Sequence, residues 1–432
     1  MLNTKVRNIG LETARGEEGY VERILNFPME AAEMAQIQGM AKYIGVTKEF
    51  KKVIDTFKVP AGETPAGFKV EYELDGQVLR ANLKRDISYD KNGQKRPTNL
   101  LFSADSANPY EVAPIKDFIA NLTCNPGIIY DLFINNPKAN IGHKFNTRDE
   151  VMGEIGRILG PGSDISVELN DPFGKSDAEI LEEAEKFREM LTGYRVVIKV
   201  PMTGPVNAQN VDELLTGDKR FSRRYNEVAT KDAFRGHNLA LMLHEHGFRV
   251  NFTLMFEPWQ SALALQARPY FINSFIRHRL MQSEAMDKDL TLYRTTGDAA
   301  YLKHLREFMI AKDYYSSKDD GVDLLEVKAK AENLLKHRNF LNEEGSDGLD
   351  SVRQNLRLLR QSNLEDTRLI ICSMEGDNNY PDIDRLLSSD EYGDMAGRVV
   401  LTAEPNYLAQ FTSANQVVSY QRRFMNAANG EK

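Results

Sequence analysis

The first part of the chain changes from helical periodicity to strand-like alternation. Apolar residues recur at three- and four-residue spacings from about residue 11 to residue 58, a pattern that predicts helices. Apolar and polar residues then alternate from Phe68 to Leu74, directly before Asp75-Gly76, a pair typical of a two-residue hairpin turn. We therefore predict an N-terminal α+β extension over residues 1–95.

From residue 96 onward the pattern becomes short apolar strands, each followed by helical periodicity. Strand-then-helix units in one sheet predict a (β/α)8 TIM barrel, in which the carboxyl ends of the strands share one mouth. The segment of about 280–365 is amphipathic helix and too long for one crossover, so we expect a helical insertion between strands six and seven. The expected strands lie near residues 99–105, 118–124, 165–169, 195–200, 248–254, 269–273, 367–373 and 398–403.

The composition of the chain indicates which partners and which cellular compartment are compatible with it. The formal net charge is −8, which argues against nucleic acid and anionic membrane surfaces as partners. The two cysteines, Cys124 and Cys372, lie in apolar segments, as expected of a protein in the reducing cytoplasm. Neither a signal peptide nor a window of roughly 18 apolar residues is recognisable, so we expect a soluble protein. A homo-oligomer is compatible with the sequence, which does not fix the number of subunits.

One expected strand carries a lysine among β-branched residues, in the sequence VVIKVPMT at residues 196–203. A buried ammonium is costly unless it is paired or gives up its proton. Desolvation favours the neutral amine, which is the form that attacks a carbonyl carbon. We therefore expect Lys199 to be the nucleophile of Schiff-base catalysis, in which the iminium serves as an electron sink for breaking the adjacent carbon–carbon bond.

The other strands deliver further polar groups to the same mouth. Two of them are carboxylates, Asp105 and Glu168, which suit the proton transfers that Schiff-base and aldol chemistry require. The alternative is that both acids are only ion-pair partners of Lys199 in the barrel interior. The neutral hydrogen-bonding groups expected at the mouth are Thr123, Asn125, Asn251, Thr253, Asn273 and Ser373.

The order of these segments resembles the transaldolase and fructose-6-phosphate aldolase family over roughly residues 98–410. The resemblance is carried by LFSADSANPYEV, LTCNPGIIYDLF, ISVELND, VVIKVPMT and GFRVNFTLMFEPWQSALALQARPYFINSFIRHR. It implies a class I mechanism without cofactor or metal. The implied substrates are a ketose donor of the dihydroxyacetone type and an aldehyde or aldose acceptor, either of which can be a sugar phosphate.

The resemblance also assigns roles to individual residues. Lys199 would hold the donor as a Schiff base, and Asp105 would move the proton of the cleaved hydroxyl. Glu168 and Thr253 would position the catalytic water. The expected substrate-binding residues are Thr123, Asn125, Asn251, Asn273, Ser373, Arg277 and Arg279.

The sequence departs from the family pattern where phosphate is bound. Asn273 replaces a serine, His278 stands at the position of an arginine that Arg277 and Arg279 flank, and Glu375 replaces an arginine after the seventh strand. A carboxylate about 4 Å from a phosphate oxygen repels it by a few kcal/mol. Unless the loop after the seventh strand is shifted in register, we expect the substrate specificity to have moved toward an unphosphorylated sugar or a substrate whose anion is held elsewhere.

Three other readings compete with transaldolase activity. One is simple aldol cleavage without transfer, and another is a catalytically silent sugar-binding or assembly protein on the same scaffold. The third is a metal-dependent aldolase that uses His237, His244 and His246. Their spacing matches no recognised ligand pattern, so we expect no metal.

Overall fold

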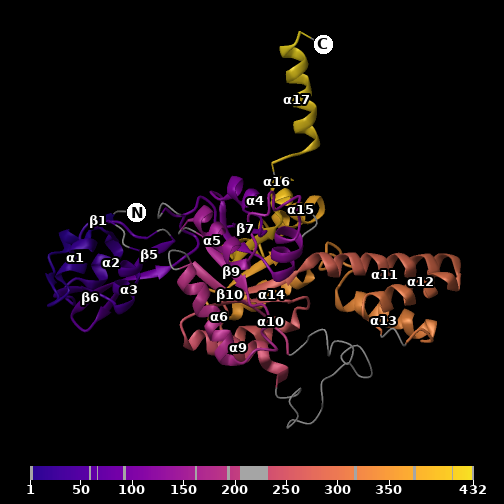
Figure 1. Ribbon diagram of the computed structural model, residues 1–432, viewed down its shortest axis with the longest axis horizontal. Coiled ribbons are helices and arrows are strands. Elements are labelled where there is room, and N and C mark those ends of the chain that lie inside the picture. The colour runs from indigo at the N-terminus through magenta and orange to yellow at the C-terminus, as the bar shows by residue number, and fades with distance from the viewer. Residues whose placement is uncertain are drawn as a thin grey trace.

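The computed structural model describes residues 3–57, 60–65, 67–90, 94–160, 163–191, 195–204, 232–315, 319–372, 376–410 and 412–430. In Figure 1 a central barrel stands between an N-terminal extension and an arm of helices, and helix α17 (Asn415–Ala428) points away from the barrel. Within the described residues, none of the helices combines the length and the apolar character that a membrane span requires.

Eight parallel strands close into a barrel in the described part of the chain, which confirms the predicted (β/α)8 fold. Each strand overlaps one of the eight segments expected from the apolar runs. The strands, in their order around the barrel, are β10 (Arg195–Pro201), β11 (Arg249–Thr253), β12 (Phe271–Phe275), β13 (Arg368–Cys372), β14 (Val399–Ala403), β7 (Leu101–Asp105), β8 (Ile119–Thr123) and β9 (Asp164–Glu168).

The barrel strands form because apolar residues cover both of their faces. Val167, Ile198 and Phe252 belong to the buried layer between strands and helices, whereas Val197 and Phe271 belong to a separate buried cluster. The helices around the barrel are α4 (Pro109–Val112), α5 (Arg148–Leu159), α6 (Asp177–Met190), α9 (Arg235–Glu245), α10 (Trp259–Ala264), α14 (Asp350–Gln361), α15 (Gly376–Leu387) and α16 (Pro405–Gln410).

The N-terminal extension has its own sheet and its own core. Its four-stranded sheet has the order β2 (Glu12–Thr13), β4 (Tyr43–Val46), β6 (Val78–Arg85), β5 (Phe68–Asp75), and β1 (Asn3–Lys5) pairs with β3 (Pro28–Glu30). The predicted β5–β6 hairpin is confirmed, with Gly76 at a φ of 61° in the turn. The helices of the extension are α1 (Glu18–Ile24), α2 (Ala31–Ile37) and α3 (Lys48–Phe57).

Strands β2, β3 and β4 lie within residues 11–58, for which the sequence pattern predicts helices, so this expectation is wrong for them. Strand β4 even continues a helical pattern in the sequence. In the structure it pairs in parallel with both β2 and β6. These long-range backbone hydrogen bonds override the local periodicity.

The segment that joins the extension to the barrel packs against the end of the barrel where the strands begin. Ile87 is fully buried and belongs to the same cluster as Leu101, Val197 and Phe271. Beside it, Asp86 forms an ion pair of 3.3 Å with Arg368 at the start of β13. The extension is therefore fixed to the barrel end opposite the expected mouth.

The helical insertion follows β12 and leaves the barrel as an arm. Helices α11 (Ile276–Thr296), α12 (Ala299–Ala311) and α13 (Leu324–His337) pack on one another around Leu290 and Leu305. The next helix, α14, packs against β12 and β13 and so belongs to the barrel.

The core of the extension predicts a large difference between two substitutions. Phe50 is fully buried in α3, whereas Leu74 at the end of β5 is 40% exposed. We expect Phe50→Ala to lower the free energy of unfolding by about 3–5 kcal/mol, since it leaves a cavity. Leu74→Ala should lower it by less than about 1 kcal/mol. Equal losses in urea unfolding would show that this core does not stabilise the extension.

Candidate active site

A pocket of about 240 Å³ lies at the carboxyl ends of the barrel strands. It contains the lysine, both carboxylates and four of the neutral polar residues expected at the mouth. Four residues that are not among the expected site residues also line it, namely Pro126, Leu254, Phe275 and Cys372. The complete lining is Asp105, Thr123, Asn125, Pro126, Glu168, Lys199, Thr253, Leu254, Asn273, Phe275 and Cys372.

Strand β10 places Lys199 in the lining of this pocket. Its side chain is buried, with the whole residue only 5% exposed. The Nζ atom lies 3.1 Å from Oε2 of Glu168 and donates a hydrogen bond of 3.3 Å to the carbonyl oxygen of Cys124. Glu168 is its direct neighbour in the register of β9 and β10. The amine therefore faces the pocket and has a carboxylate within proton-transfer distance.

Asp105 ends strand β7 and lines the same pocket. Its Oδ1 atom is buried and has no hydrogen-bond partner among the described residues. Burial raises the pKa of Asp105 to about 6, against the opposing effect of the Lys199 charge. A carboxyl group with this pKa can both accept and donate a proton near neutral pH.

The charge that the surroundings of Lys199 favour differs from the expectation. Burial by itself lowers the pKa of the Lys199 ammonium, as anticipated from its β-branched neighbours. The charges of Glu168 and Asp105 outweigh burial and hold that pKa above its ordinary value. These surroundings therefore favour the ammonium form of Lys199, and an attack on a carbonyl by this amine would first require the loss of a proton.

A chain of hydrogen bonds between buried polar side chains crosses the barrel interior. Asn273 donates to Asn251 at 2.7 Å, Asn251 to Ser166 at 3.1 Å, Ser166 to Asn121 at 3.2 Å, and Asn121 to Ser103 at 2.8 Å. Asn251 does not line the pocket, and both ends of its amide are engaged in this chain. Binding of a donor hydroxyl by Asn251 would require one of these hydrogen bonds to open.

The remaining neutral residues take different positions at the mouth. The Oγ1 atom of Thr123 is buried and lacks a hydrogen-bond partner among the described residues, so it is available to a ligand. Thr253 is buried at the end of β11. The Oδ1 atom of Asn125 accepts a hydrogen bond of 2.9 Å from the backbone of Ile128, where a π-helical turn begins.

Three residues are expected to bind a substrate anion. Arg277 and Arg279 lie outside the pocket, and Ser373 lies outside the described residues. Arg279 is buried in α11 and forms ion pairs with Asp350 and, at 3.1 Å, with Glu257. Arg277 is on the same helix and is partly exposed. Ser373 and Glu375 fall in residues that the structure does not describe. Phosphate binding by Arg279 would require its ion pairs to open.

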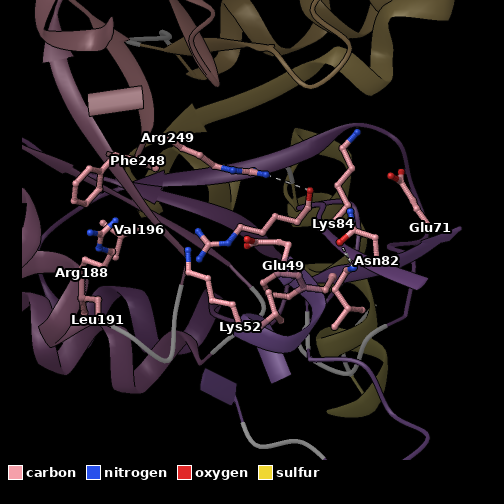
Figure 2. Close-up of a pocket in the computed structure, with 15 residues that line it drawn as sticks. Glu49, Lys52, Glu71, Asn82, Lys84, Arg188, Leu191, Val196, Phe248 and Arg249 are labelled. Atoms are coloured by element: carbon pink, nitrogen blue, oxygen red, sulfur yellow. Dashed lines mark hydrogen bonds between the residues drawn. The ribbon is translucent and has the colours of Figure 1, made fainter. Parts of the chain in front are cut away.

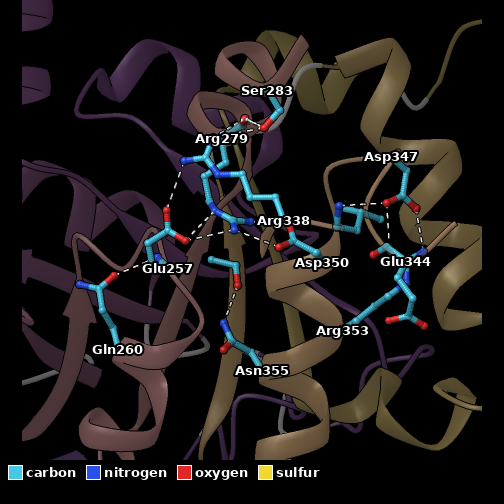
Figure 3. A network of polar contacts seen from close by, with 12 residues as sticks. Glu257, Gln260, Arg279, Ser283, Arg338, Glu344, Asp347, Asp350, Arg353 and Asn355 are labelled. Carbon is cyan, nitrogen blue, oxygen red and sulfur yellow. Dashed lines mark hydrogen bonds and ion pairs between the residues drawn. The ribbon is translucent and has the colours of Figure 1, made fainter. Parts of the chain in front are cut away.

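Arg279 belongs to a network that ties the helical arm to the loop after β11 (Figure 3). Arg338 at the end of α13 forms an ion pair of 3.3 Å with Glu257 and hydrogen bonds with Ser283 and Tyr314. Glu257 follows Leu254, which lines the pocket and has a φ of 55°. The arm is thus connected to one wall of the pocket.

The histidines of α9 do not converge. His237 lies 3.4 Å from the Asn238 side chain, and His246 lies 2.9 Å from the carbonyl oxygen of Met242. Burial lowers the pKa of His244. Within the described residues, no group of three or more His, Cys, Asp or Glu side chains is arranged to hold a metal ion.

The chain is similar to a known protein family and to a described relative. The model of one family, described as transaldolase/fructose-6-phosphate aldolase, matches residues 102–426. The relative described as "Probable transaldolase 1", from Listeria monocytogenes serotype 4b (strain F2365), is 26% identical over 121 residues, which cover 28% of this chain and 55% of the relative. The chain thus spans about half the length of this relative. The family match confirms the resemblance and leaves out the N-terminal extension.

The ion-pair network predicts a structural effect of Arg279. Arg279→Ala would leave Asp350 as a buried carboxylate without its guanidinium partner. We expect the free energy of unfolding to fall by about 3–5 kcal/mol in urea unfolding. Arg277→Ala, on the partly exposed side of the same helix, is the matched control and should cost less than about 1 kcal/mol. An Arg279→Ala protein as stable as this control would contradict the structural role.

Proposed function

Since the chain belongs to the transaldolase/fructose-6-phosphate aldolase family, we propose that it makes or breaks a carbon–carbon bond through a Schiff base on Lys199. The donor is a ketose with a dihydroxyacetone-type end, and the acceptor is an aldehyde or aldose. Release of the donor to water would give simple aldol cleavage, whereas its capture by a second aldehyde gives transfer.

One observation carries this proposal: a buried lysine amine shares a pocket of about 240 Å³ with two carboxylates. Glu168 is 3.1 Å from the amine, and Asp105 presents a buried oxygen without a hydrogen-bond partner among the described residues. A lysine that served only as an ion-pair partner would not need a cavity in front of it. The pairing of unlike carboxylates around a nucleophile is typical of an active site.

Schiff-base formation begins with a proton transfer. The Lys199 ammonium gives a proton to Glu168, and the neutral amine adds to the ketone carbon of the donor to form a carbinolamine. Protonation of the carbinolamine hydroxyl, with Glu168 as the donor, releases water and leaves the iminium. Thr253 lines the pocket beside these groups and is proposed to orient this water.

Cleavage of the carbon–carbon bond uses the second carboxylate. Asp105 accepts the proton of the hydroxyl next to the breaking bond, while the bonding electrons move onto the iminium and give an enamine. The aldehyde product leaves, and the enamine then attacks the acceptor aldehyde by the reverse sequence. The pKa of about 6 keeps Asp105 mostly deprotonated at pH 7 and still able to return the proton.

The small pocket supports a donor site for a three-carbon unit. Thr123, Asn125 and Asn273 are proposed to bind its hydroxyls, with Phe275 and Leu254 as apolar walls. Arg279 is engaged with carboxylates, so the anion of a phosphorylated substrate is proposed to be held by other residues, with Arg277 and Ser373 as the remaining candidates. Two free, buried cysteines, Cys124 and Cys372, support a cytoplasmic location.

Borohydride trapping tests the covalent step. With a ketose that carries the dihydroxyacetone end, reduction should add the mass of the three-carbon donor to Lys199, as seen by peptide mass spectrometry. Lys199→Ala should abolish the adduct, because no other described lysine lines the pocket. Lys186→Ala, which removes an exposed lysine on α6, is the control and should label like the parent protein. Full labelling of the Lys199→Ala protein would refute the proposal.

The pKa of Asp105 sets a pH dependence for cleavage. The base has to be deprotonated, so kcat/KM should rise with pH through an apparent pKa of about 6 and then level off. Asp105→Asn should lower the rate by about 10²–10⁴-fold and remove this limb. Glu404 raises the pKa of Asp105, so Glu404→Gln should move the limb to lower pH. A limb that persists in the Asp105→Asn protein would assign the base to another group.

A further inference from the structure

Leu254 differs from the other residues that line the lysine pocket in its exposure and in its backbone conformation. It is 39% exposed, whereas the other lining residues are buried or half-buried. A residue that lines the pocket and also faces solvent lies at the boundary between the two. Its φ of 55° is in the left-handed region, which residues with a side chain rarely adopt. The surrounding structure therefore has to hold Leu254 in this conformation.

The strand register places Leu254 on the solvent side of Lys199. Lys199 on β10 pairs with Asn251 on β11, and Leu254 follows three residues further toward the carboxyl end of β11. Each residue of a strand adds about 3.3 Å, so Leu254 lies about 10 Å closer to the barrel mouth than the level of the lysine. In the proposed mechanism, a donor bound to Lys199 has Leu254 between itself and solvent.

The side chain of Gln260 fixes the loop that contains Leu254. Its Nε2 atom donates a hydrogen bond of 3.0 Å to the carbonyl oxygen of Leu254. Its Oε1 atom accepts hydrogen bonds from the backbone of Phe256, at 2.8 Å, and of Glu257, at 3.0 Å. These three bonds hold residues 254–257 in one shape and support the left-handed conformation of Leu254.

The helical arm fixes the same loop through Glu257 (Figure 3). The Glu257 carboxylate lies between two arginines, 3.1 Å from Arg279 of α11 and 3.3 Å from Arg338 at the end of α13. Both arginines are buried. Asp350 pairs with Arg279 as well, so the two cations face two carboxylates and the charges balance. The packing of the arm therefore reaches the pocket wall through a buried and electrically balanced network.

The beginning of β11 is fixed as well. Arg249, the first residue of this strand, lines a cavity of about 610 Å³ between the barrel and the N-terminal extension (Figure 2). Its guanidinium lies 4.1 Å from the centre of the Tyr270 ring, and its Nη2 atom donates a hydrogen bond of 3.5 Å to the carbonyl oxygen of Arg85. A shift of the strand that displaced Leu254 would break contacts at both ends of β11.

We propose that Leu254 is a specificity-determining residue that favours transfer of the donor over its release to water. This inference rests on the proposed Schiff-base function. After cleavage, the enamine on Lys199 has two fates. In transfer, its carbon forms a bond to the carbonyl carbon of the acceptor aldehyde, and Asp105 gives its proton to the alkoxide that forms. In release, the same carbon takes a proton from water, the remaining hydroxide takes the proton of Asp105, and hydrolysis of the iminium frees a three-carbon ketone.

The apolar side chain of Leu254 disfavours the water that release requires. An ordered water needs two to four polar partners, and Leu254 offers none on the solvent side of the enamine. An aldehyde that carries its own carbon chain can pack against this side chain. Gln260 and Arg338 are positioning residues, because they hold Leu254 through the loop and through Glu257.

The ratio of the two products tests this role. With fructose 6-phosphate as donor and D-glyceraldehyde as acceptor, release gives dihydroxyacetone and transfer gives an unphosphorylated six-carbon ketose. Liquid chromatography with mass spectrometry measures both, and their ratio does not depend on the fraction of active protein. Leu254→Asn keeps a side chain of similar size that tolerates a positive φ, and it gives water polar partners. It should raise the release-to-transfer ratio about tenfold, the discrimination that one methylene provides in an apolar pocket.

The control variants separate polarity and position from general damage. Leu254→Met keeps an apolar side chain and should leave the ratio near that of the parent protein. Gln260→Met removes the three hydrogen bonds and should raise the ratio. Gln266→Met, which removes an exposed glutamine that donates to the carbonyl oxygen of Ala262, should not. Arg338→Met should raise the ratio alone and add nothing to Leu254→Asn, because it acts through Leu254.

Three results would overturn the proposal. The first is an equal ratio for Leu254→Asn, Leu254→Met and the parent protein, and the second is an equal rise in both variants. The third is a parent protein that forms dihydroxyacetone without the transfer product. Borohydride labelling of Lys199 with fructose 6-phosphate separates this failure from that of the proposed function. Labelling with an unchanged ratio overturns the role of Leu254 alone, whereas the absence of labelling and of both products overturns the role and the proposed function together.

Discussion

The contact on which the active-site arrangement depends is the ion pair between Lys199 and Glu168 in the barrel mouth. Burial and the neighbouring charges have opposite effects on the pKa of Lys199. The strand residues around Lys199 disfavour the ammonium, and the two carboxylates favour it more strongly. The amine is consequently stored in its protonated form, next to the group that can accept its proton. In the proposed mechanism, a substrate carbonyl that enters the pocket meets the amine and its base already in contact.

The barrel supplies the rigidity that this ion pair requires. Lys199 and Glu168 lie side by side in the register of β9 and β10, so the backbone fixes their spacing. In the barrel interior, the hydrogen-bond chain from Asn273 to Ser103 links one buried polar side chain from each of five strands. On one side of the mouth, the Glu257 ion pairs connect the pocket wall to the helical arm. The barrel and the arm thus lie within the region that the family model matches, whereas the N-terminal extension lies outside it.

The barrel and most of the residues that line its pocket could be predicted from local sequence. Each barrel strand is a short apolar run, and its carboxyl end lies at the mouth of the barrel. Lys199, Asp105 and Glu168 were placed together on that ground, and the structure brings them into one pocket. The failures involve contacts that local sequence does not encode. Arg279 is engaged by Asp350, 71 residues further along the chain. The charge of Lys199 depends on the summed effect of burial and two acids, and a run of valines shows only the first of these.

Oxygen exchange tests the Schiff-base claim most directly, because iminium formation expels the carbonyl oxygen of the donor and hydrolysis replaces it with oxygen from water. A ketose labelled with ¹⁸O at the ketone should lose its label when incubated with the protein and no acceptor. The loss should outpace that in protein-free buffer and in the Lys199→Ala variant. Carbon–carbon bond cleavage with full retention of the label in the recovered ketose and in the donor product would contradict a covalent intermediate on Lys199.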